Sequence, residues 1–507
     1  MLRTAANQVP SRLSADPQIP TTRQADLAPL VLAILLFSAL SLVASVTSQG
    51  FLEADGCTHY LYARFALAEP HYLVNVWGRP LCTALYAIPA VIGGRFGVRT
   101  ASLFLAVGCA LVARSIALSL GDRRPTLSAI FTLAQPLVFL HSFSELTELP
   151  FALLLGAAFL FYVRRQFLLM TLLISLGPLS RPEGFGFLVL AAFALAAHRR
   201  LRWLPLLPIP LIVWDIAGWR LFGQPIYPGF SQHLPAFLQW IDWLPQNWPY
   251  AQKSAYLPGS LFHFVMLLPA VASPLIFPAM CVGIYRTFLP FDLADHQKRC
   301  RFLTAAIPVL VLCGHSFLYW TGRMASSGEL RYMLVVAPFW GILSAHGWTW
   351  IFERYRWSWL MTSAAIASIA PIAVNHFYQV IPLTYSEDWI QAKNVAAWLD
   401  QTPLRHDCPK ILAAHPGIFY FLGISQTDHA AAREWTKKTV DSAPSQTILI
   451  WDSVYGVYNS DTGRSVSLDE IRAAGWVSVP VSLARDKIDS TTKKAVPDWR
   501  FFISPTR

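Results

Sequence analysis

The stretch that decides the fold is LAPLVLAILLFSALSLVASV, Leu27–Val46, which contains no charged side chain. About 20 apolar residues are enough for a helix to cross the hydrocarbon core of a bilayer, so this stretch predicts a transmembrane helix. It follows a tail that carries Arg3, Arg12 and Arg23, an arrangement that resembles a signal peptide. Its length and the lack of a clear A-x-A cleavage site indicate a retained signal anchor instead, with residues 1–27 as a cytoplasmic tail.

Similar apolar stretches recur through the first three quarters of the chain. Of its 507 residues 54% are hydrophobic and 14% are charged, against roughly 25% charged in ordinary soluble domains. Lipid must therefore be the solvent for most of the chain, and we predict an α-helical polytopic membrane protein whose membrane domain covers residues 28–380. About eleven spans are expected, near residues 28–47, 99–120, 126–143, 149–163, 167–180, 185–197, 203–221, 262–285, 302–320, 332–351 and 359–379.

The location of the net charge, +11, matters more than its size. From Ile381 onward there are 14 Lys and Arg and 14 Asp and Glu, which leaves 26 basic and 15 acidic residues in the membrane part. The whole excess of basic residues lies in the membrane part, mostly in short loops beside the spans. Basic residues in such loops interact with anionic lipids and determine the orientation of the spans during insertion. We therefore expect membrane lipids as partners and no nucleic-acid binding.

The basic residues also predict which loops face the cytoplasm. With the N-terminal tail in the cytoplasm, the basic loops all fall on the cytoplasmic side only if the apolar stretch Leu81–Ile92 does not cross the membrane. This stretch is short and contains Pro89, so we expect it to lie in the membrane interface. The result is a long first outer loop, residues 47–98, and an outer C-terminus. Loops expected inside carry Arg123-Arg124, Arg164-Arg165, Arg199-Arg200 with Arg202, Lys298-Arg299 with Arg301, and Arg354 with Arg356; loops expected outside lie around Glu145–Glu148, Arg181–Glu183, residues 223–256 and Thr321–Arg331.

From residue 381 to residue 507 the pattern is that of a small α/β domain, which the predicted sidedness makes extracytoplasmic. Trp389–Leu399 has helical spacing, and Lys410–Ala414 and Thr447–Trp451 indicate strands. Ser467–Glu470 is a capping box that opens another helix. No glycine-rich phosphate loop accompanies these elements, so a nucleotide site is not supported.

Seven cysteines are scattered without a C-x-x-C pair, which gives no support for a zinc or thioredoxin-like site. Cys57 and Cys82 share the first outer loop. They could form a disulfide if that loop faces an oxidising compartment, and two free thiols are the alternative.

Two acidic residues follow the first span, in Phe51-Leu52-Glu53-Ala54-Asp55-Gly56. Residues i and i+2 of an extended loop project the same way, so Glu53 and Asp55 could face one site. Asp55 would then be a general base toward a hydroxyl, and Glu53 would support it or bind a divalent cation such as Mg²⁺ or Mn²⁺. The alternative is a pair of solvated acids near the membrane surface.

Three arginines lie on the same predicted side: Arg79 before Pro80-Leu81, Arg181 before Pro182-Glu183-Gly184, and Arg331 within Glu329-Leu330-Arg331-Tyr332. A guanidinium binds phosphate oxygens in a bidentate fork, so such a cluster suits a lipid-linked phosphate. The alternative is that each arginine snorkels to lipid headgroups.

Other polar residues have plainer explanations. Glu145 and Glu148 lie one helical turn apart in a short outer loop, and we expect an exposed helix end there. Asp215 lies in or near the end of an apolar span, where an acid is a functional candidate by default. Three histidines without ligand-like spacing are expected to be packed side chains: His263, His315 and His346.

Together these motifs resemble those of the polyprenyl-phosphate-sugar-dependent glycosyltransferases of the GT-C superfamily, especially the bacterial branch related to protein O-mannosyltransferases and lipid A aminoarabinose transferases. The resemblance covers roughly residues 28–380. Glu53 and Asp55 match the family's acidic pair in a long first outer loop, whereas Arg79-Pro80-Leu81 matches its basic-Pro-Pro-Leu stretch only in part. The further matches are Phe96-Gly97-Val98 with Arg99 before the second span, Arg181-Pro182-Glu183-Gly184, Glu329-Leu330-Arg331-Tyr332 and a soluble outer C-terminal domain.

The resemblance implies sugar transfer from a polyprenyl phosphate to a hydroxyl of a lipid, glycan or protein acceptor outside the cytoplasm, with inversion in a single displacement. Asp55 would take the acceptor proton, and Arg331 with Arg181 or Arg79 would stabilise the departing phosphate. Glu183, Glu329 and Tyr332 would complete the substrate site.

A bacterial inner membrane is favoured over the secretory pathway because no Asn-x-Ser/Thr sequon occurs. The alternatives are a transporter or lipid flippase and a non-catalytic membrane scaffold. Transporters tend to show repeats and broken helices around polar sites at the midplane, whereas this chain has its charges at the ends of predicted spans.

Overall fold

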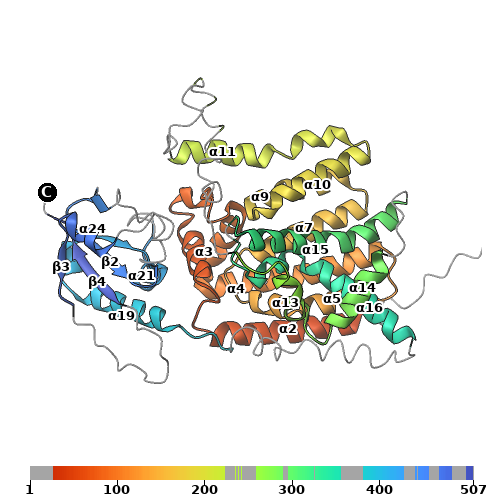
Figure 1. Cartoon of the computed structure of the whole chain (residues 1–507), viewed down its shortest axis with the longest axis horizontal. Helices are drawn as coiled ribbons and strands as arrows, with labels where there is room; N and C mark the ends of the chain where they lie inside the picture. The colour runs from red at the N-terminus through yellow and green to blue at the C-terminus, as the bar shows by residue number, and fades with distance from the viewer. Residues whose placement is uncertain are drawn as a thin grey trace, which may run out of the picture.

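The structure is a computed structural model that describes residues 27–222, 235, 238, 241, 258–288, 295–324, 326–354, 381–426, 440–441, 443–455, 467–481 and 498–505. A bundle of helices and a small α/β domain lie side by side, and helix α3 (Ala54–Phe65) lies where they meet (Figure 1). The predicted architecture, a helical membrane part followed by a small α/β domain, is confirmed.

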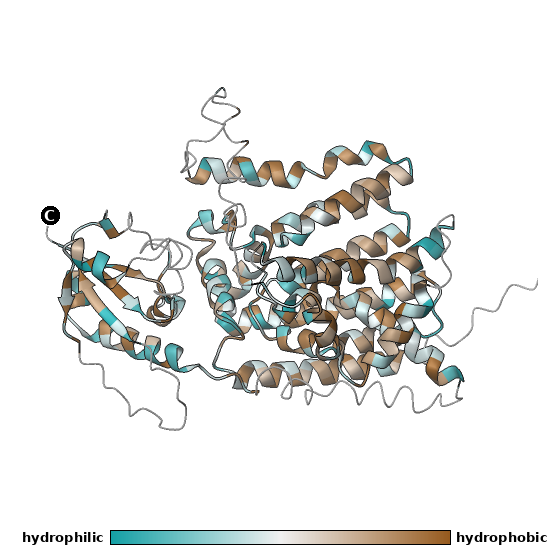
Figure 2. Ribbon diagram, in the orientation of Figure 1, coloured by the Kyte–Doolittle hydropathy of each residue, from teal (hydrophilic) through white to brown (hydrophobic). Residues whose placement is uncertain are grey.

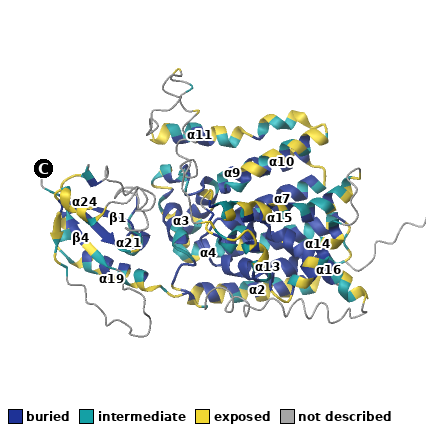
Figure 3. Cartoon of the chain, viewed as in Figure 1, coloured by how far each residue is buried: buried dark blue, intermediate teal, exposed yellow. Residues whose placement is uncertain are grey.

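The bundle turns large apolar side chains outward. Val43 on α2 (Leu27–Thr47) is 62% exposed, Phe104 on α4 (Pro80–Ser119) 71%, and Phe193 on α10 (Glu183–Ala197) 68%. Figures 2 and 3 show such apolar, exposed positions along the outer helices. Extended apolar faces of this kind are stable in lipid and not in water. The chain is thus a multi-pass membrane protein.

Five helices of the described residues are long and apolar enough to cross a membrane, or six if one bent pair is a single span. The predicted number of about eleven stays a prediction, and its last span, near residues 359–379, lies outside the described residues. The other elements of the bundle are α5 (Pro125–Leu133), α6 (Pro136–His141), α7 (Glu148–Val163), α8 (Phe167–Ser175), α9 (Gly177–Ser180), η2 (Leu201–Leu206), α11 (Ile209–Phe222), α13 (His263–Ala272), α14 (Phe277–Phe288), α15 (His296–Thr321), η5 (Leu330–Val336) and α16 (Ala337–Arg354), besides η1 (Pro70–Leu73) beside α3.

Proline breaks several predicted spans, because it lacks the N–H that continues the helical ladder and restricts the residue before it. Residues 126–143 form α5 and α6, with the break before Pro136. Residues 262–285 form α13 and α14, which meet at 113°. The break lies at Ser273, whose φ is +77° and which precedes Pro274. The span predicted near residues 262–285 is therefore a bent pair of helices, and whether the pair crosses as one span stays a prediction.

Helix α4 is kinked at Gly94, whose φ of 57° and ψ of −145° suit a residue without Cβ. A Cβ on Gly97 would collide with the carbonyl of Pro89, although eight residues of straight helix would separate the two by about 12 Å along the axis. The segment with the predicted interfacial stretch Leu81–Ile92 thus turns sharply away from the rest of α4. Its Ile88 and Ile92 are 60% and 82% exposed, as an apolar face against lipid requires.

The α/β domain has a four-stranded sheet in the order β1-β2-β4-β3. β1 and β2 are parallel, and β4 runs antiparallel to β2 and β3. Along β2, Ile448 and Ile450 pack toward α19 and α21, whereas Leu449 packs toward α24, as the period of two requires. The predicted strands and the capping box at Ser467 are confirmed. The elements are α19 (Glu387–Gln401), α20 (Leu404–Asp407), β1 (Lys410–Ala413), α21 (Pro416–Leu422), β2 (Thr447–Asp452), α24 (Leu468–Ala473), β3 (Val477–Val479) and β4 (Trp499–Ile503).

This domain packs on the loop and helix that follow the first span. The ring of Phe51 lies 5.2 Å from that of Trp389 and 5.0 Å from that of Tyr420. The guanidinium of Arg95, from α4, lies 4.8 Å from the centre of the Phe51 ring. The contact therefore joins the α/β domain to the chain immediately before Glu53.

All seven cysteines are described, and all are free. The Cys57 thiol lies 3.9 Å from the Pro416 carbonyl, whereas the Cys82 thiol lies 3.4 Å from the Ser180 hydroxyl. Of the two possibilities left open for Cys57 and Cys82, the structure has the two free thiols, because the side chains point toward different elements.

The charged loops gather at two ends of the bundle, as the predicted alternation requires. At one end, which we call the basic end, Arg301 donates to the Leu120 carbonyl, His296 contacts the Val163 carbonyl and Arg123 pairs with Glu353. At the other, which we call the site end, residues from the loops around positions 53, 148, 181 and 331 meet. Which end faces the cytoplasm stays a prediction.

Candidate active site

Arg331, on the first turn of η5, is the centre of the charged cluster at the site end. Its guanidinium lies 2.7 Å from Glu53 Oε2 and 3.0 Å from Asp55 Oδ2. Its Nε donates to Glu329 and lies 3.7 Å from Glu148 Oε1. The Arg331 side chain is only 9% exposed, so these carboxylates replace the water that it lost on folding.

Glu53 and Asp55 reach Arg331 from a helix start and not from an extended loop, which corrects the predicted geometry. Glu53 is the extended N-cap residue of α3, with φ −147° and ψ 160°. Asp55 lies in the first helical turn, where backbone N–H groups favour a negative charge. Both carboxylates are about one-third exposed, and Asp55 is therefore accessible from outside the cluster.

Arg181 extends the cluster into the bundle. Its guanidinium lies 2.6 Å from Glu148 Oε1 and 3.0 Å from Glu183 Oε1. Glu183 in turn lies 3.4 Å from the His315 ring. Glu148 therefore joins Arg181 to Arg331, and the two predicted phosphate ligands form one network.

Tyr332 lies over the same network. Its ring is stacked on that of His315 at 4.8 Å, and the Arg181 guanidinium lies 5.8 Å from the ring centre. Its hydroxyl lies 3.1 Å from the Ser327 hydroxyl. His315, expected to be an ordinary packed histidine, is thus a neighbour of two site residues.

Arg79 lies beside this network. It is buried, has a φ of 60° and is the N-cap residue of α4, where Pro80 begins the helix. Its Nη1 donates to the Val76 carbonyl at 3.1 Å. Its charge acts on His59 together with those of Asp55 and Arg331, and burial lowers the pKa of His59 to about 3. His59 is therefore neutral at physiological pH.

The expectation that Glu145 and Glu148 form an exposed helix end is wrong. Their side chains are 0% and 2% exposed. Glu145 Oε1 lies 2.8 Å from Arg99 Nε, and Arg99 also donates to the carbonyls of Ser45 and Gly50. The pair thus fixes the end of α2 just before Glu53. The sequence did contain a signal for these ion pairs, because acidic side chains within an apolar stretch are stable only when they are paired.

Asp215, the acid considered in an apolar span, is buried on α11. The neighbouring Trp214 donates from its indole to the Val74 carbonyl at 2.7 Å. No contact in the described structure joins Asp215 to Arg331 or Arg181, so Asp215 is not part of this network.

The network contains two arginines, Arg181 and Arg331, and more carboxylates than arginines. Burial raises the pKa of Glu53 to about 8; Arg331 opposes the shift, and Glu329, Glu148 and Asp55 add to it. Glu53 is therefore mostly protonated at neutral pH. The carboxylates of the network are Glu53, Asp55, Glu148, Glu183 and Glu329.

Arg331 lies between Glu53 and Asp55, where a divalent cation held by both would have to lie. Among the described residues no group of three or more His, Cys, Asp or Glu is arranged to hold a metal ion. In this arrangement Glu53 and Asp55 do not form a site for such a cation. Binding of Mg²⁺ or Mn²⁺ by Glu53 and Asp55 stays a prediction.

Comparison with known proteins gives structural matches alone: no protein-family model matches the chain, and no curated protein matches it. ArnT from Cupriavidus metallidurans bound to undecaprenyl phosphate has a TM-score of 0.59 at 12% identity, over 95% of this chain and 98% of that one. The same protein in the apo state gives 0.58, at 12% identity over 94% and 98%. The apo Archaeoglobus fulgidus oligosaccharyltransferase gives 0.55, at 13% identity over 90% of this chain and 73% of that one. The protein therefore has the fold of the GT-C glycosyltransferases.

Proposed function

We propose that the protein is an integral membrane glycosyltransferase that moves a hexose or pentose from a polyprenyl phosphate to a hydroxyl acceptor on the extracytoplasmic side of a bacterial inner membrane. The fold supports this proposal, and so does the structural neighbour that was crystallised with undecaprenyl phosphate. The observation that carries it is the meeting of a part-exposed Asp55 with Arg331 and, through Glu148, with Arg181. A base and two phosphate-binding groups are what such a transfer needs.

Asp55 is the proposed general base. It takes the proton of the acceptor hydroxyl while that oxygen attacks the anomeric carbon of the donor. The bond between this carbon and the phosphate oxygen breaks, and its electron pair leaves with the polyprenyl phosphate. One displacement from the opposite face inverts the anomeric centre.

Arg331 has a double role in this scheme because it pairs with Asp55 before substrate binds. A guanidinium beside a carboxylate lowers its basicity. When the donor phosphate recruits Arg331, Asp55 loses part of this pairing and becomes a better base. Protonated Glu53 helps, because it holds Arg331 less strongly than an ionised carboxylate would. A cation at Glu53 and Asp55 would require Arg331 to leave at least one of them.

The test uses full-length protein in liposomes with undecaprenyl-phosphate mannose and undecaprenyl-phosphate aminoarabinose, together with a bacterial envelope extract as acceptor source. We expect release of undecaprenyl phosphate from one donor. Asp55→Asn should slow release by about 10²- to 10⁴-fold, the usual contribution of a general base. Asp400→Asn, on the exposed end of α19, is the matched control and should not change the rate.

An Asp55→Asn protein that is inserted and still releases undecaprenyl phosphate at the wild-type rate would contradict the proposed role. Movement of the intact donor across the liposome bilayer without its cleavage would instead favour a flippase. Binding of an envelope protein without either event would favour a scaffold.

A further inference from the structure

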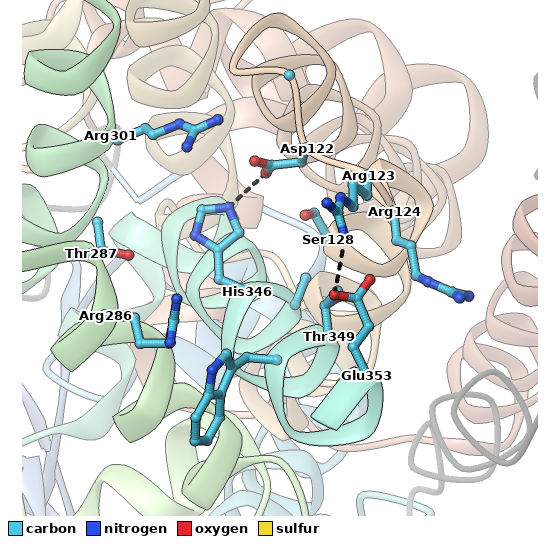
Figure 4. A pocket seen from close by; sticks show the side chains of 13 residues that line it. Asp122, Arg123, Arg124, Ser128, Arg286, Thr287, Arg301, His346, Thr349 and Glu353 are labelled. Atoms are coloured by element: carbon cyan, nitrogen blue, oxygen red, sulfur yellow. Dashed lines mark hydrogen bonds and ion pairs between the residues drawn. The ribbon is translucent and has the colours of Figure 1, made fainter. Parts of the chain in front are cut away.

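A cavity of about 390 Å³ lies at the basic end, within the size range of ordinary ligand sites. Figure 4 shows its lining, which comes from the turn after α4, from α5, from the end of α14, from the first turn or two of α15 and from the last turns of α16. None of these residues belongs to the network around Arg331. The cavity is therefore a separate site.

Close packing of α14 on α16 builds one wall. A Cβ on Gly283 would collide with the Leu343 carbonyl, and a Cβ on Gly347 would collide with the Ala279 carbonyl. The two backbones can touch because both positions are glycine. This contact brings Arg286, one turn after Gly283, to the cavity wall that His346 forms (Figure 4).

The lining carries four arginines and two carboxylates, and both carboxylates have partners. Asp122 Oδ2 lies 2.6 Å from the His346 ring, and Glu353 Oε2 lies 3.4 Å from Arg123. Among the described residues the other three arginines pair with no carboxylate; they are Arg124, Arg286 and Arg301. The cavity thus has a positive charge that the part of the chain described here does not neutralise.

Arg286 and Arg301 are held in place without losing that charge. Arg301 donates to the Leu120 carbonyl at 2.7 Å, which leaves its other N–H groups available. The Arg286 guanidinium lies 5.2 Å from the centre of the Trp350 ring. Both are preorganised to receive an anion.

Ser128 gives an independent indication of a ligand. It lines the cavity, is 1% exposed, and its hydroxyl has no hydrogen-bond partner among the described atoms. A buried hydroxyl without a partner is unfavourable, so such groups usually face an unplaced water, ion or ligand. An anion with several acceptor oxygens would satisfy both the hydroxyl and the guanidinium groups.

We propose that this cavity binds the phosphate headgroup of an anionic phospholipid from the leaflet at the basic end. Arg331 precedes α16 and the cavity lies on its last turns. The 18 residues of α16 are about 27 Å long, close to the hydrocarbon thickness of about 30 Å. The cavity therefore lies at the headgroup level opposite the candidate active site. Exposed Trp350 and Tyr285 beside it are the aromatic residues typical of a membrane interface.

Native mass spectrometry of the full-length protein in detergent tests the proposal with three probes: phosphatidylglycerol, phosphatidylcholine with the same acyl chains, and sodium phosphate. We expect phosphatidylglycerol to bind at least about tenfold more tightly than the other two. The double variant Arg286→Gln/Arg301→Gln should weaken it roughly 25-fold, about fivefold for each arginine near an anionic lipid. Arg202→Gln should leave binding unchanged, since that guanidinium lies 4.6 Å from a Trp203 ring but outside the cavity.

Two further variants keep the test independent of folding. Arg286→Lys, which keeps the charge, should retain most of the binding, and Ser128→Ala should weaken it about threefold. Equal affinity for phosphatidylcholine, or unchanged binding in the double variant, would overturn the proposal. Sodium phosphate that binds as tightly as phosphatidylglycerol would make this a site for free phosphate and would overturn the lipid assignment. Sugar transfer is not part of the readout, so the result does not depend on the proposed function.

Discussion

The two ends of the bundle use arginine in opposite ways. At the site end Arg331 and Arg181 are 9% exposed and face more carboxylates than they can neutralise. At the basic end Arg123 is 81% exposed and Arg286 and Arg301 pair with no described carboxylate. A buried cation needs counter-charges, whereas an exposed one is solvated by water or headgroups. Arginines that look alike in the sequence thus differ in their burial and in their partners.

This contrast changes the expectation for the phosphate site. The three predicted arginines were expected to offer free positive charge to a phosphate, but the network around Arg331 has a surplus of carboxylates. In the proposed reaction, the donor phosphate must therefore exchange places with a carboxylate. The basic end, where no site was predicted, instead offers positive charge that no carboxylate of the described residues neutralises.

Replacing Arg331 should have the largest effect and is the strongest test of this contrast. Arg331→Gln leaves Glu53, Asp55 and Glu148 without their shared counter-charge. Breaking a buried pair costs roughly 3–5 kcal/mol, and loss of a phosphate-stabilising group should slow transfer by about 10²- to 10³-fold. Thermal unfolding in detergent and release of undecaprenyl phosphate measure the two effects.

A second substitution tests whether the carboxylates around residue 331 destabilise the fold once the arginine charge is removed. Adding Glu329→Gln removes part of the negative surplus, and among the described residues this carboxylate is paired with Arg331 alone. The double variant should therefore unfold at a higher temperature than Arg331→Gln alone. Its transfer activity should stay low because Arg331, the group proposed to bind the donor phosphate, is still missing. A double variant no more stable than the single one would show that the carboxylates are not coupled through Arg331.

The sequence predicted much of this site because its turns are local. Arg181-Pro182-Glu183 and Glu329-Leu330-Arg331 each place an arginine two residues from its own carboxylate, and both pairs form. Contacts between segments that lie far apart in the sequence could not be predicted from it. Glu148 joins Arg181 to Arg331 only because α7 and η5 pack together in three dimensions.

The fold was predictable to a similar degree. Composition and basic loops indicate the membrane domain and its two ends. They do not reveal the 113° bend between α13 and α14, since the helices on both sides of Ser273-Pro274 are apolar and together have the length of one span. The sequence also did not predict the close backbone contact of α14 and α16 at Gly283 and Gly347, because this contact depends on which faces of the two helices meet.

Arg99→Gln should have the next largest effect, chiefly on stability. Arg99 is 1% exposed at its side chain, pairs with Glu145 and donates to three backbone carbonyls near the end of α2. Its loss should cost roughly 3 kcal/mol and release the chain before Glu53. We expect kcat to fall with little change in KM for the donor, because Arg99 does not touch the network around Arg331. A selective rise in KM would instead place Arg99 in donor binding.

The pH dependence of donor binding should show a smaller effect, through Glu53. Its pKa is raised from 4.5 to about 8, so the folded protein holds a proton that the unfolded chain has lost between these values. Stability therefore falls as pH rises from about 4.5 to 8. Above pH 8 the new negative charge opposes a phosphate, and KM for the donor should rise about fivefold between pH 7 and pH 9. Glu53→Gln should flatten this rise; a profile identical to that of the wild type would assign the titration to another group.

The smallest effect is expected for Arg123→Gln at the basic end. Arg123 lies 3.4 Å from Glu353, but its side chain is 81% exposed and that of Glu353 is 40% exposed. Exposed pairs of this kind contribute about 0–1 kcal/mol, so the unfolding temperature in detergent should change little and should respond to salt. Transfer activity should stay at the wild-type rate. Arg123 and Arg331 are both paired arginines at helix ends, but Arg331 is buried among four carboxylates whereas Arg123 is exposed beside one. Comparing the unfolding temperatures of their variants therefore measures what burial and additional partners contribute together. An equally large fall in unfolding temperature for Arg123→Gln would show that neither burial nor the number of partners sets the contribution of these arginines.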